Sequence, residues 1–346
     1  MAGHIRGFLF VDFNALPPGQ HNPLLFSLFA ITRTGKQSVL VFFVLSGFLV
    51  GGKTIQKLRE GTFNLQSYAV DRVVRIYLPL ISALLLVIAT TIIINKENDY
   101  RVLFGNFLSL QGVVVPPASP LFWSLSYEVW FYVIMGAVAC FFSTTSSRQR
   151  IGAFAVLLIS FAVFTRLQLL YLVIWMIGAL SYLFVPVKKN KLLFLLTVLI
   201  CLGMLVPLQM TTTSKFVTSS WQNYLNGDLL ELIFSSAVAL LIVQVITFVP
   251  KTRIAKGLDR LGTRLASFSY TLYLVHYPLL GLLMHYGFPK SNKIDLLSLT
   301  WYFLVIAGCM AVSYALYWLF EKRTAAVKKH INNLLSSPRR KTVPAR

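Results

Sequence analysis

Long apolar runs separated by short polar connections dominate the chain. The predicted full-length spans lie near residues 37–52, 77–95, 121–142, 151–166, 168–186, 191–208, 228–249, 267–288 and 296–320, and a shorter apolar stretch covers 1–13. A helix needs about 20 residues to cross the hydrocarbon core of a bilayer, and several runs reach that length. The pattern therefore predicts an all-α polytopic transmembrane helix bundle of about ten spans.

Two apolar stretches are too short to span a bilayer as they stand. Residues 102–115 are predicted to be interfacial or re-entrant. Residues 1–13 have about half the length of a span, with His4 near one end and Asp12 near the other. They form either an interfacial helix or the outer half of a truncated span. The second alternative would place His4 at membrane depth.

Basic residues alternate between successive connections. If residues 1–13 end outside, the predicted cytoplasmic segments hold 23 of the 32 Lys and Arg residues, and these segments are 53–75, 143–150, 187–191, 250–264 and 321–346. Positive charge in short loops stays on the cytoplasmic side, so we expect a cytoplasmic C-terminus. This division of the net charge of +21 argues against nucleic-acid binding. We predict a membrane domain over 1–323 and a basic cytoplasmic tail over 324–346.

Composition narrows the function classes further. Hydrophobic residues make up 56% of the chain, against about 45–50% in soluble domains, and little polar sequence is left for a soluble domain. The sequence contains no G-x-S-x-G elbow, which argues against a hydrolase of that type. No histidine pair has metal-ligand spacing, so no metal site is predicted.

The segment WSLSYEVWFY (123–132) places a carboxylate, Glu128, inside an apolar run. Ionisable groups at membrane depth are costly, and they mark functional sites by default. Ser126 and Tyr132 lie in the same segment and are further candidates. The chemical interpretation of Glu128 is a general base or an orienting group. The alternative is a structural carboxylate that accepts hydrogen bonds from a tyrosine or an arginine.

Arg72 and Arg75 lie three residues apart at the predicted cytoplasmic end of a span, so they share a helix face. Paired guanidinium groups bind phosphates with two parallel hydrogen bonds. Simple anchoring at the cytoplasmic surface explains the same pair equally well. The pair is thus either a phosphate site or a membrane anchor.

Two further segments carry candidate chemistry. Tyr270, Tyr273 and His276 recur at intervals of three and share a broad helix face. His276 is a candidate catalytic residue, although a hydrogen-bonded structural histidine is favoured. Ser46 and Gly47 lie in an aromatic span, where small residues favour close helix packing over chemistry.

Taken together, these segments resemble the acyltransferase 3 family of bacterial integral-membrane O-acyltransferases. The resemblance rests on FFVLSGFLV (42–50), RVVRIYLP (72–79), WSLSYEVWFY (123–132), SYTLYLVHYPL (269–279) and SYALYWLFEK (313–322). The third segment is the most specific, and the five occur in the family's order. Leu78 is inserted before Pro79, and Arg323 stands where a proline is often found. The last segment ends at Glu321, which is a further candidate.

The resemblance implies transfer of an acyl group, usually acetyl, from cytoplasmic acyl-CoA to a hydroxyl of a cell-surface or secreted glycan. His4 matches the family's essential histidine by position, although the basic residue and the half-helix that precede it in the family have no counterpart. Glu128 would orient His4 or stabilise its charged form, and Arg72 and Arg75 would hold CoA phosphates. No permanently bound cofactor is expected.

The expected surroundings follow from the same resemblance. The protein would lie in the bacterial inner membrane, with membrane lipids around it and a glycan or lipid-linked saccharide as acceptor. Two alternatives remain open. One is a non-catalytic glycan transporter or flippase, against which the lack of an internal repeat counts. The other is an inactive truncated homologue.

Overall fold

The computed structural model describes residues 1–346 except 186–189, 212–225, 247–251, 289 and 337–346. The described part is built from helices and contains no β-strand beyond two isolated bridges. The helices of its first half are α1 (Ala2–Leu9), α2 (Pro23–Thr32), α3 (Gly35–Ser46), α4 (Lys53–Arg59), α5 (Leu65–Ile93), α6 (Tyr100–Phe107) and α7 (Trp123–Ser143). The later ones are α8 (Ser147–Phe164), α9 (Leu169–Ser181), α10 (Lys191–Gly203), α11 (Leu205–Thr211), α12 (Gly227–Val245), α13 (Arg253–His285), α14 (Leu296–Leu319) and α15 (Thr324–Ser336).

Seven helical segments of the described chain are long and apolar enough to cross a membrane. They are Pro23–Arg59, Leu65–Ile93, Pro120–Ser143, Ser147–Phe164, Lys191–Gln209, Gly227–Val245 and Leu296–Leu335. This confirms the predicted all-α polytopic bundle. The other three predicted spans correspond to α9, a shorter apolar helix, to the eight-residue α1, and to the second half of α13.

Helix α3 continues into α4 through a π-helical segment, η3 (Gly47–Gly52). A Cβ atom built on Gly47 would lie 2.0 Å from the carbonyl oxygen of Trp175 in α9, and one on Gly178 would lie 2.2 Å from that of Val44. Only residues without a Cβ allow backbones to approach so closely. The close helix packing predicted at Gly47 is therefore confirmed.

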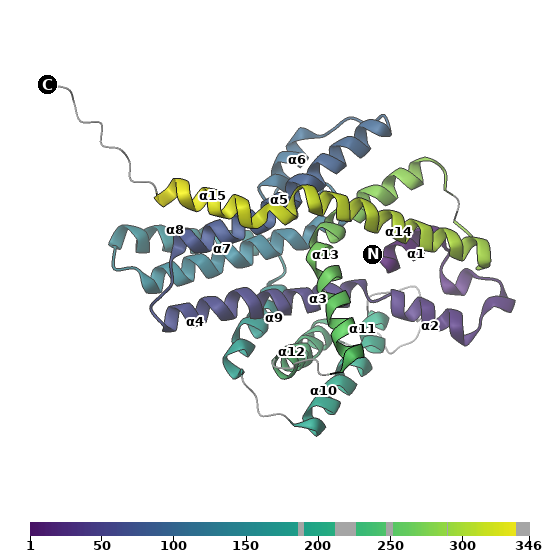
Figure 1. The fold of residues 1–346 in the computed structure, drawn as a ribbon, viewed down its shortest axis with the longest axis horizontal. Helices are drawn as coiled ribbons and strands as arrows, with labels where there is room; N and C mark the ends of the chain where they lie inside the picture. The colour runs from purple at the N-terminus through teal and green to yellow at the C-terminus, as the bar shows by residue number, and fades with distance from the viewer. Residues whose placement is uncertain (186–189, 212–225, 247–251, 289, 337–346) are drawn as a thin grey trace.

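Helices α5, α7 and α8 lie side by side in one part of the bundle, while α13 crosses it steeply (Figure 1). Helix α15 packs against α5, where Lys328 Nζ lies 2.5 Å from Asp71 Oδ1. The first part of the predicted tail is thus a helix attached to the bundle. The rest of the tail lies outside the described residues.

The predicted short segment 102–115 does not span the bundle. It contains the end of α6 and a turn that the buried Asn106 side chain closes. Asn106 Nδ2 donates to the carbonyl oxygens of Val102 and Pro116, and its Oδ1 accepts from the N–H of Ala118. This turn leads into the short helix η4 (Pro120–Phe122), which starts α7 at the level of the candidate site.

The end of α4, the α7–α8 turn and the end of α15 gather at one end of the molecule, on the left in Figure 1. These ends belong to three of the segments predicted to be cytoplasmic, 53–75, 143–150 and 321–346. Their grouping agrees with the charge alternation. The side of the membrane on which this end lies stays a prediction.

Candidate functional site

Two histidines from opposite ends of the chain meet inside the bundle. His4 of α1 and His276 of α13 are stacked, with ring centroids 5.3 Å apart, and His4 Nδ1 lies 3.0 Å from His276 Nε2. His276 is fully buried. Helix α1 reaches this position because it packs against both α13 and α14. The two imidazoles therefore form a hydrogen-bonded pair in the core.

The hydrogen bonds of His276 fix where the protons lie in the neutral pair. His276 Nδ1 is 2.8 Å from the carbonyl oxygen of Leu272, and a carbonyl only accepts, so Nδ1 carries the proton. His276 Nε2 then holds a lone pair and accepts from His4 Nδ1–H. The remaining nitrogen, His4 Nε2, is left with a free lone pair. When both histidines are neutral, His4 Nε2 is therefore the one ring nitrogen not used in these hydrogen bonds.

The free nitrogen of His4 faces the beginning of α3. A Cβ atom built on Gly35, the first residue of α3, would lie 3.9 Å from His4 Nε2, so the hydrogen atom of glycine leaves space there. The ring of Tyr277 contacts His4 edge-on, with centroids 5.9 Å apart. Gly35 therefore lies beside the unshared nitrogen of the His4 imidazole.

Glu128 lies in a second cluster, between α3, α7 and α13. Its Oε1 accepts from Tyr132 Oη at 2.6 Å, and its Oε2 accepts from Tyr270 Oη at 3.3 Å. Tyr132 Oη also lies 2.9 Å from Ser46 Oγ, which accepts from Trp175 Nε1 at 3.1 Å. Glu128 is buried, and each of its carboxylate oxygens has a hydroxyl partner. The structural reading of this carboxylate is the one its contacts favour.

No hydrogen bond joins His4 and Glu128 in the described part of the structure, so an orienting role of Glu128 toward His4 stays a prediction. His4 bonds to His276, while Glu128 bonds to two tyrosines. Helix α13 supplies a partner to each group, His276 to His4 and Tyr270 to Glu128. Tyr273 lies between the two clusters, with its Oη 2.8 Å from Ser124 Oγ and its ring 6.4 Å from that of His276.

Arg72 and Arg75 border the Glu128 cluster on α5. Arg72 lies over the ring of Tyr132 at 5.5 Å, and Arg75 over the ring of Tyr270 at 6.0 Å. Arg75 Nη1 also pairs with Glu321 Oε1 at 3.1 Å, and Thr271 donates to the other oxygen of this buried carboxylate. Both arginines therefore contact the cluster, and Arg75 already has an anionic partner.

Ser126 lies outside both clusters. Its hydroxyl donates to the carbonyl oxygen of Ser109 at 2.9 Å, and Trp130 Nε1 donates to the same oxygen at 3.1 Å. Ser109 has a positive φ of 56°, an unusual conformation for a residue with a side chain. Ser126 thus holds the turn after α6 in place.

Sequence reasoning missed an ion pair in the bundle. Lys36 of α3 pairs with Glu231 of α12, and Glu231 is buried. The signal was present, because Glu231 interrupts an apolar run in the same manner as Glu128. Lys36 follows Gly35 directly, so this pair ties α12 to the end of α3 that faces His4.

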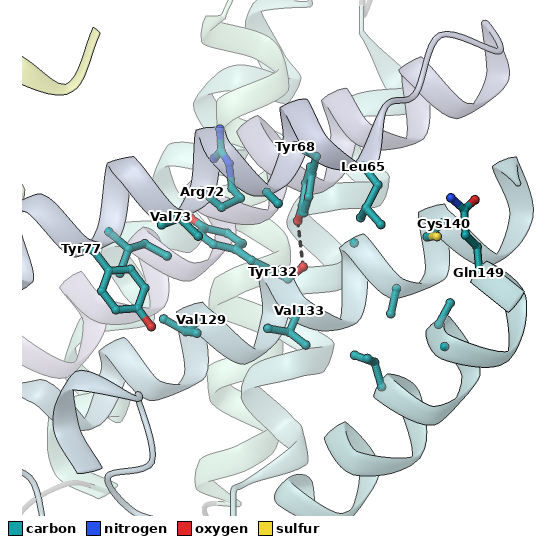
Figure 2. Close-up of a pocket in the computed structure, with 17 residues that line it drawn as sticks. Leu65, Tyr68, Arg72, Val73, Tyr77, Val129, Tyr132, Val133, Cys140 and Gln149 are labelled. Carbon is teal, nitrogen blue, oxygen red and sulfur yellow. Dashed lines mark hydrogen bonds between the residues drawn. The ribbon is translucent and has the colours of Figure 1, made fainter. Parts of the chain in front are cut away.

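Two cavities adjoin these clusters. The smaller, of 170 Å³, is lined by parts of α5 and α13 and by the segment before η4, including Thr90, Ser119 and Tyr277. The larger, of 510 Å³, is a groove between α5, α7 and α8, and Figure 2 shows Tyr68, Arg72, Tyr132 and Gln149 among its lining side chains. The described residues include no group of three or more His, Cys, Asp or Glu side chains placed to hold a metal ion.

Comparison with protein families matches residues 3–331 to the family described as an acyltransferase domain, the acyltransferase 3 type. Comparison with curated proteins and with solved structures finds no match. The family match covers nearly the whole chain, including both histidines, Glu128 and the two arginines of α5. The chain therefore belongs to the acyltransferase 3 family, a family of multi-pass membrane acyltransferases.

Proposed function

We propose that the protein transfers an acyl group, acetyl in the default case, from cytoplasmic acyl-CoA to a hydroxyl of a cell-surface or secreted glycan. The bacterial inner membrane would be its location. The single observation that carries this proposal is the histidine pair, which leaves the lone pair of His4 Nε2 unshared within the pair and facing Gly35. A sugar hydroxyl is a weak nucleophile and needs such a base near neutral pH.

The reaction needs one proton acceptor and one acyl donor. His4 Nε2 removes the proton of the acceptor hydroxyl as its oxygen attacks the thioester carbonyl carbon. A C–O ester bond forms, the C–S bond breaks, and the CoA thiolate leaves and takes up a proton. General-base catalysis of this kind typically contributes 10²–10⁴-fold in rate.

In this proposal His276 is a positioning residue. It accepts the Nδ1 proton of His4 and so keeps the basic lone pair on the opposite nitrogen, which faces Gly35. The carbonyl oxygen of Leu272 in turn fixes the His276 ring. The arrangement repeats the logic of a triad, with a backbone carbonyl as the third member.

The donor end of the site is proposed at Arg72 and Arg75. The Arg75 side chain is 52% exposed, so a phosphate can reach it, and its present partner is Glu321. A CoA phosphate would compete with that carboxylate for the guanidinium. We therefore expect Glu321 to tune donor binding, because it must release Arg75 when the phosphate binds.

The acceptor end is proposed at the 170 Å³ cavity. Tyr277 lines it and also contacts His4, so the cavity lies one side chain away from the base. Ser119 lines the same cavity, and its buried Oγ has no hydrogen-bond partner in the part of the chain that the structure describes. A hydroxyl-rich acceptor would provide that partner, and the Tyr277 ring offers an apolar face to a sugar.

Glycan analysis tests the function directly. Cells that carry the intact gene should show an alkali-labile O-linked ester on a surface or secreted glycan, and the ester should disappear with His4→Ala. His285→Ala is the matched control, because His285 is an exposed histidine at the end of α13. An ester that persists in cells whose His4→Ala protein is present at normal membrane abundance would reject the base assignment.

A further inference from the structure

The groove between α5, α7 and α8 has an almost entirely apolar lining. Arg72 is the one charged residue among the described residues that line it. Its floor is formed by small residues of α7 and α8, including Gly136, Ala137, Gly152 and Ala153. Tyr68 packs over Gly136, where an added Cβ would lie 2.9 Å from the ring, and donates to the carbonyl oxygen of Tyr132 (Figure 2).

Helix α8, which forms one wall of this groove, faces the lipid. Only 22% of the span in α8 is buried. The exposed apolar side chains of this helix include Ile151, Phe154, Leu158 and Phe161. A groove bordered by such a helix opens toward hydrocarbon, where a polar ligand such as CoA would lose its hydration without compensation. The occupant that fits these walls is an alkyl chain.

The length of the groove matches one leaflet. Its lining on α5 runs from Leu65 to Tyr77, which corresponds to about 18 Å at 1.5 Å per residue. Half of a typical hydrocarbon core is about 15 Å. Leu65 begins α5, and Gln149 at the same end of the groove lies in the first turn of α8. One end of the groove therefore reaches the ends of helices, where lipid headgroups lie.

The charge at that end is positive. Gln149 is flanked by Arg148 and Arg150, and all three are exposed. Arg150 Nε donates to the carbonyl oxygen of Thr144, which holds the arginine beside the α7–α8 turn. The N-terminus of α8 adds its partial positive charge to these two guanidinium groups. An anionic headgroup is the complement of this surface.

We propose that this groove is a binding site for one alkyl chain of an anionic membrane phospholipid, with the phosphate beside Arg148 and Arg150 and the chain lying along Tyr68 and Tyr132. The chain would cover the outer side of the Tyr132 ring, whose hydroxyl bonds to Glu128. The bound lipid is thus part of the wall that supports the Glu128 cluster. This proposal does not depend on the acyl-transfer proposal.

A glycine pair gives a matched test. Gly152 lines the groove, and a Cβ built there meets nothing within 4 Å, so Gly152→Leu fills the groove without a backbone clash. Gly308 of α14 is equally open and exposed but lies outside the groove, so Gly308→Leu is the control. Both changes replace a helical glycine with a better helix former, so their effects on helix stability are alike.

The probe is phosphatidylglycerol that carries a photoreactive diazirine in one acyl chain, reconstituted with the full-length protein in vesicles of phosphatidylcholine. Peptide mass spectrometry should locate adducts on the groove residues of α5, α7 and α8. Gly152→Leu should lower this labelling at least fivefold, while Gly308→Leu should leave it unchanged. Equal labelling in Gly152→Leu and wild type, or adducts confined to other helices, would overturn the proposal.

The headgroup is tested separately. Arg148→Gln combined with Arg150→Gln should lower labelling by the phosphatidylglycerol probe at least threefold. A phosphatidylcholine probe with the same diazirine chain should label the wild-type groove several-fold less and should not respond to the arginine changes. If both probes label the groove equally in the wild type, the site does not select an anionic lipid and the proposal fails in that part.

Discussion

The bundle contains two buried polar clusters that share helix α13 but differ in how their hydrogen bonds are used. In the Glu128 cluster, each carboxylate oxygen accepts a tyrosine hydroxyl, and one of those hydroxyls is linked onward to Ser46. In the histidine pair, three of the four ring nitrogens are donors or acceptors within the pair or to Leu272, and His4 Nε2 has no hydrogen-bond partner among the described residues. The carboxylate oxygens of Glu128 are thus both used by protein donors, whereas one nitrogen of the histidine pair is not used.

This difference in hydrogen bonding distinguishes a structural role from a catalytic one. A carboxylate whose oxygens are both occupied by protein donors has a fixed position, and removing a partner costs desolvation energy. A base must instead keep one lone pair for the substrate. By this criterion we propose that Glu128, the ionisable residue in the most specific sequence segment, supports the site and that His4 performs the proton transfer.

The largest expected effect follows from removing the free base. His4→Ala should lower acyl transfer by about 10²–10⁴-fold, because the acceptor hydroxyl loses its proton acceptor. The measurement is ester formation per unit of protein in membranes, with His285→Ala as control. Near-normal transfer by His4→Ala would place the chemistry in the other cluster.

The next effect comes from closing the space beside the free nitrogen. Gly35→Val adds a Cβ 3.9 Å from His4 Nε2 and two methyl groups beyond it, so we expect up to about a 10²-fold loss through misplacement of the acceptor. Gly7→Val on α1, where an added Cβ meets nothing within 4 Å, should retain activity. Similar losses in both variants, measured at equal membrane abundance, would show that the space beside His4 is not used.

A smaller effect is expected from the positioning residue. His276→Leu removes the acceptor for His4 Nδ1–H, and the loss of one hydrogen bond of about 1 kcal/mol corresponds to roughly fivefold in rate. His276→Gln offers a carbonyl acceptor in place of Nε2 and should recover part of the rate. A Gln variant that is no better than Leu at equal thermal stability would contradict the tautomer argument.

The smallest effect on catalysis, and a clear one on stability, is expected for Glu128→Gln. The amide has one acceptor oxygen where two hydroxyls donate to the carboxylate, so one buried tyrosine must turn or lose its partner at a cost of about 1–3 kcal/mol. Thermal unfolding in detergent should show a lower midpoint, while the folded fraction keeps most of its activity. Loss of activity at unchanged stability would give Glu128 a chemical role and erase the distinction between the clusters.

Helix periodicity predicted much of this arrangement. The intervals of three among Tyr270, Tyr273 and His276 predicted a shared side of α13; Tyr270 and His276 each belong to one cluster, and Tyr273 lies between the two. The carboxylate within an apolar run correctly marked a buried polar centre at Glu128. Such patterns are local, because the pitch of a helix fixes which side chains share a face.

The partners were not predictable in the same way. His4 and His276 are 272 positions apart, and nothing in the spacing of one helix specifies which neighbour it faces. The bounds of the predicted span 267–288 were limited for the same reason. Helix α13 is 33 residues long, and its basic first half was assigned to a loop because composition alone does not indicate a helix there. Packing between helices decides both questions, and a single sequence carries little direct record of it.

The π-helical segment η3 changes the direction in which side chains point along the apolar run 37–52, although the hydrophobicity of that run is uniform. An α-helix advances about 100° per residue, so one extra residue in a turn shifts every later side chain by that angle. Before η3, Ser46 is aimed at Tyr132; within it, Gly51 and Gly52 meet Ala179 and Tyr182. In a continuous α-helix the fixed rotation per residue would not point all of these residues at their present partners. Deleting one residue from η3 would therefore preserve hydrophobicity and helicity yet rotate α4 out of register with α7.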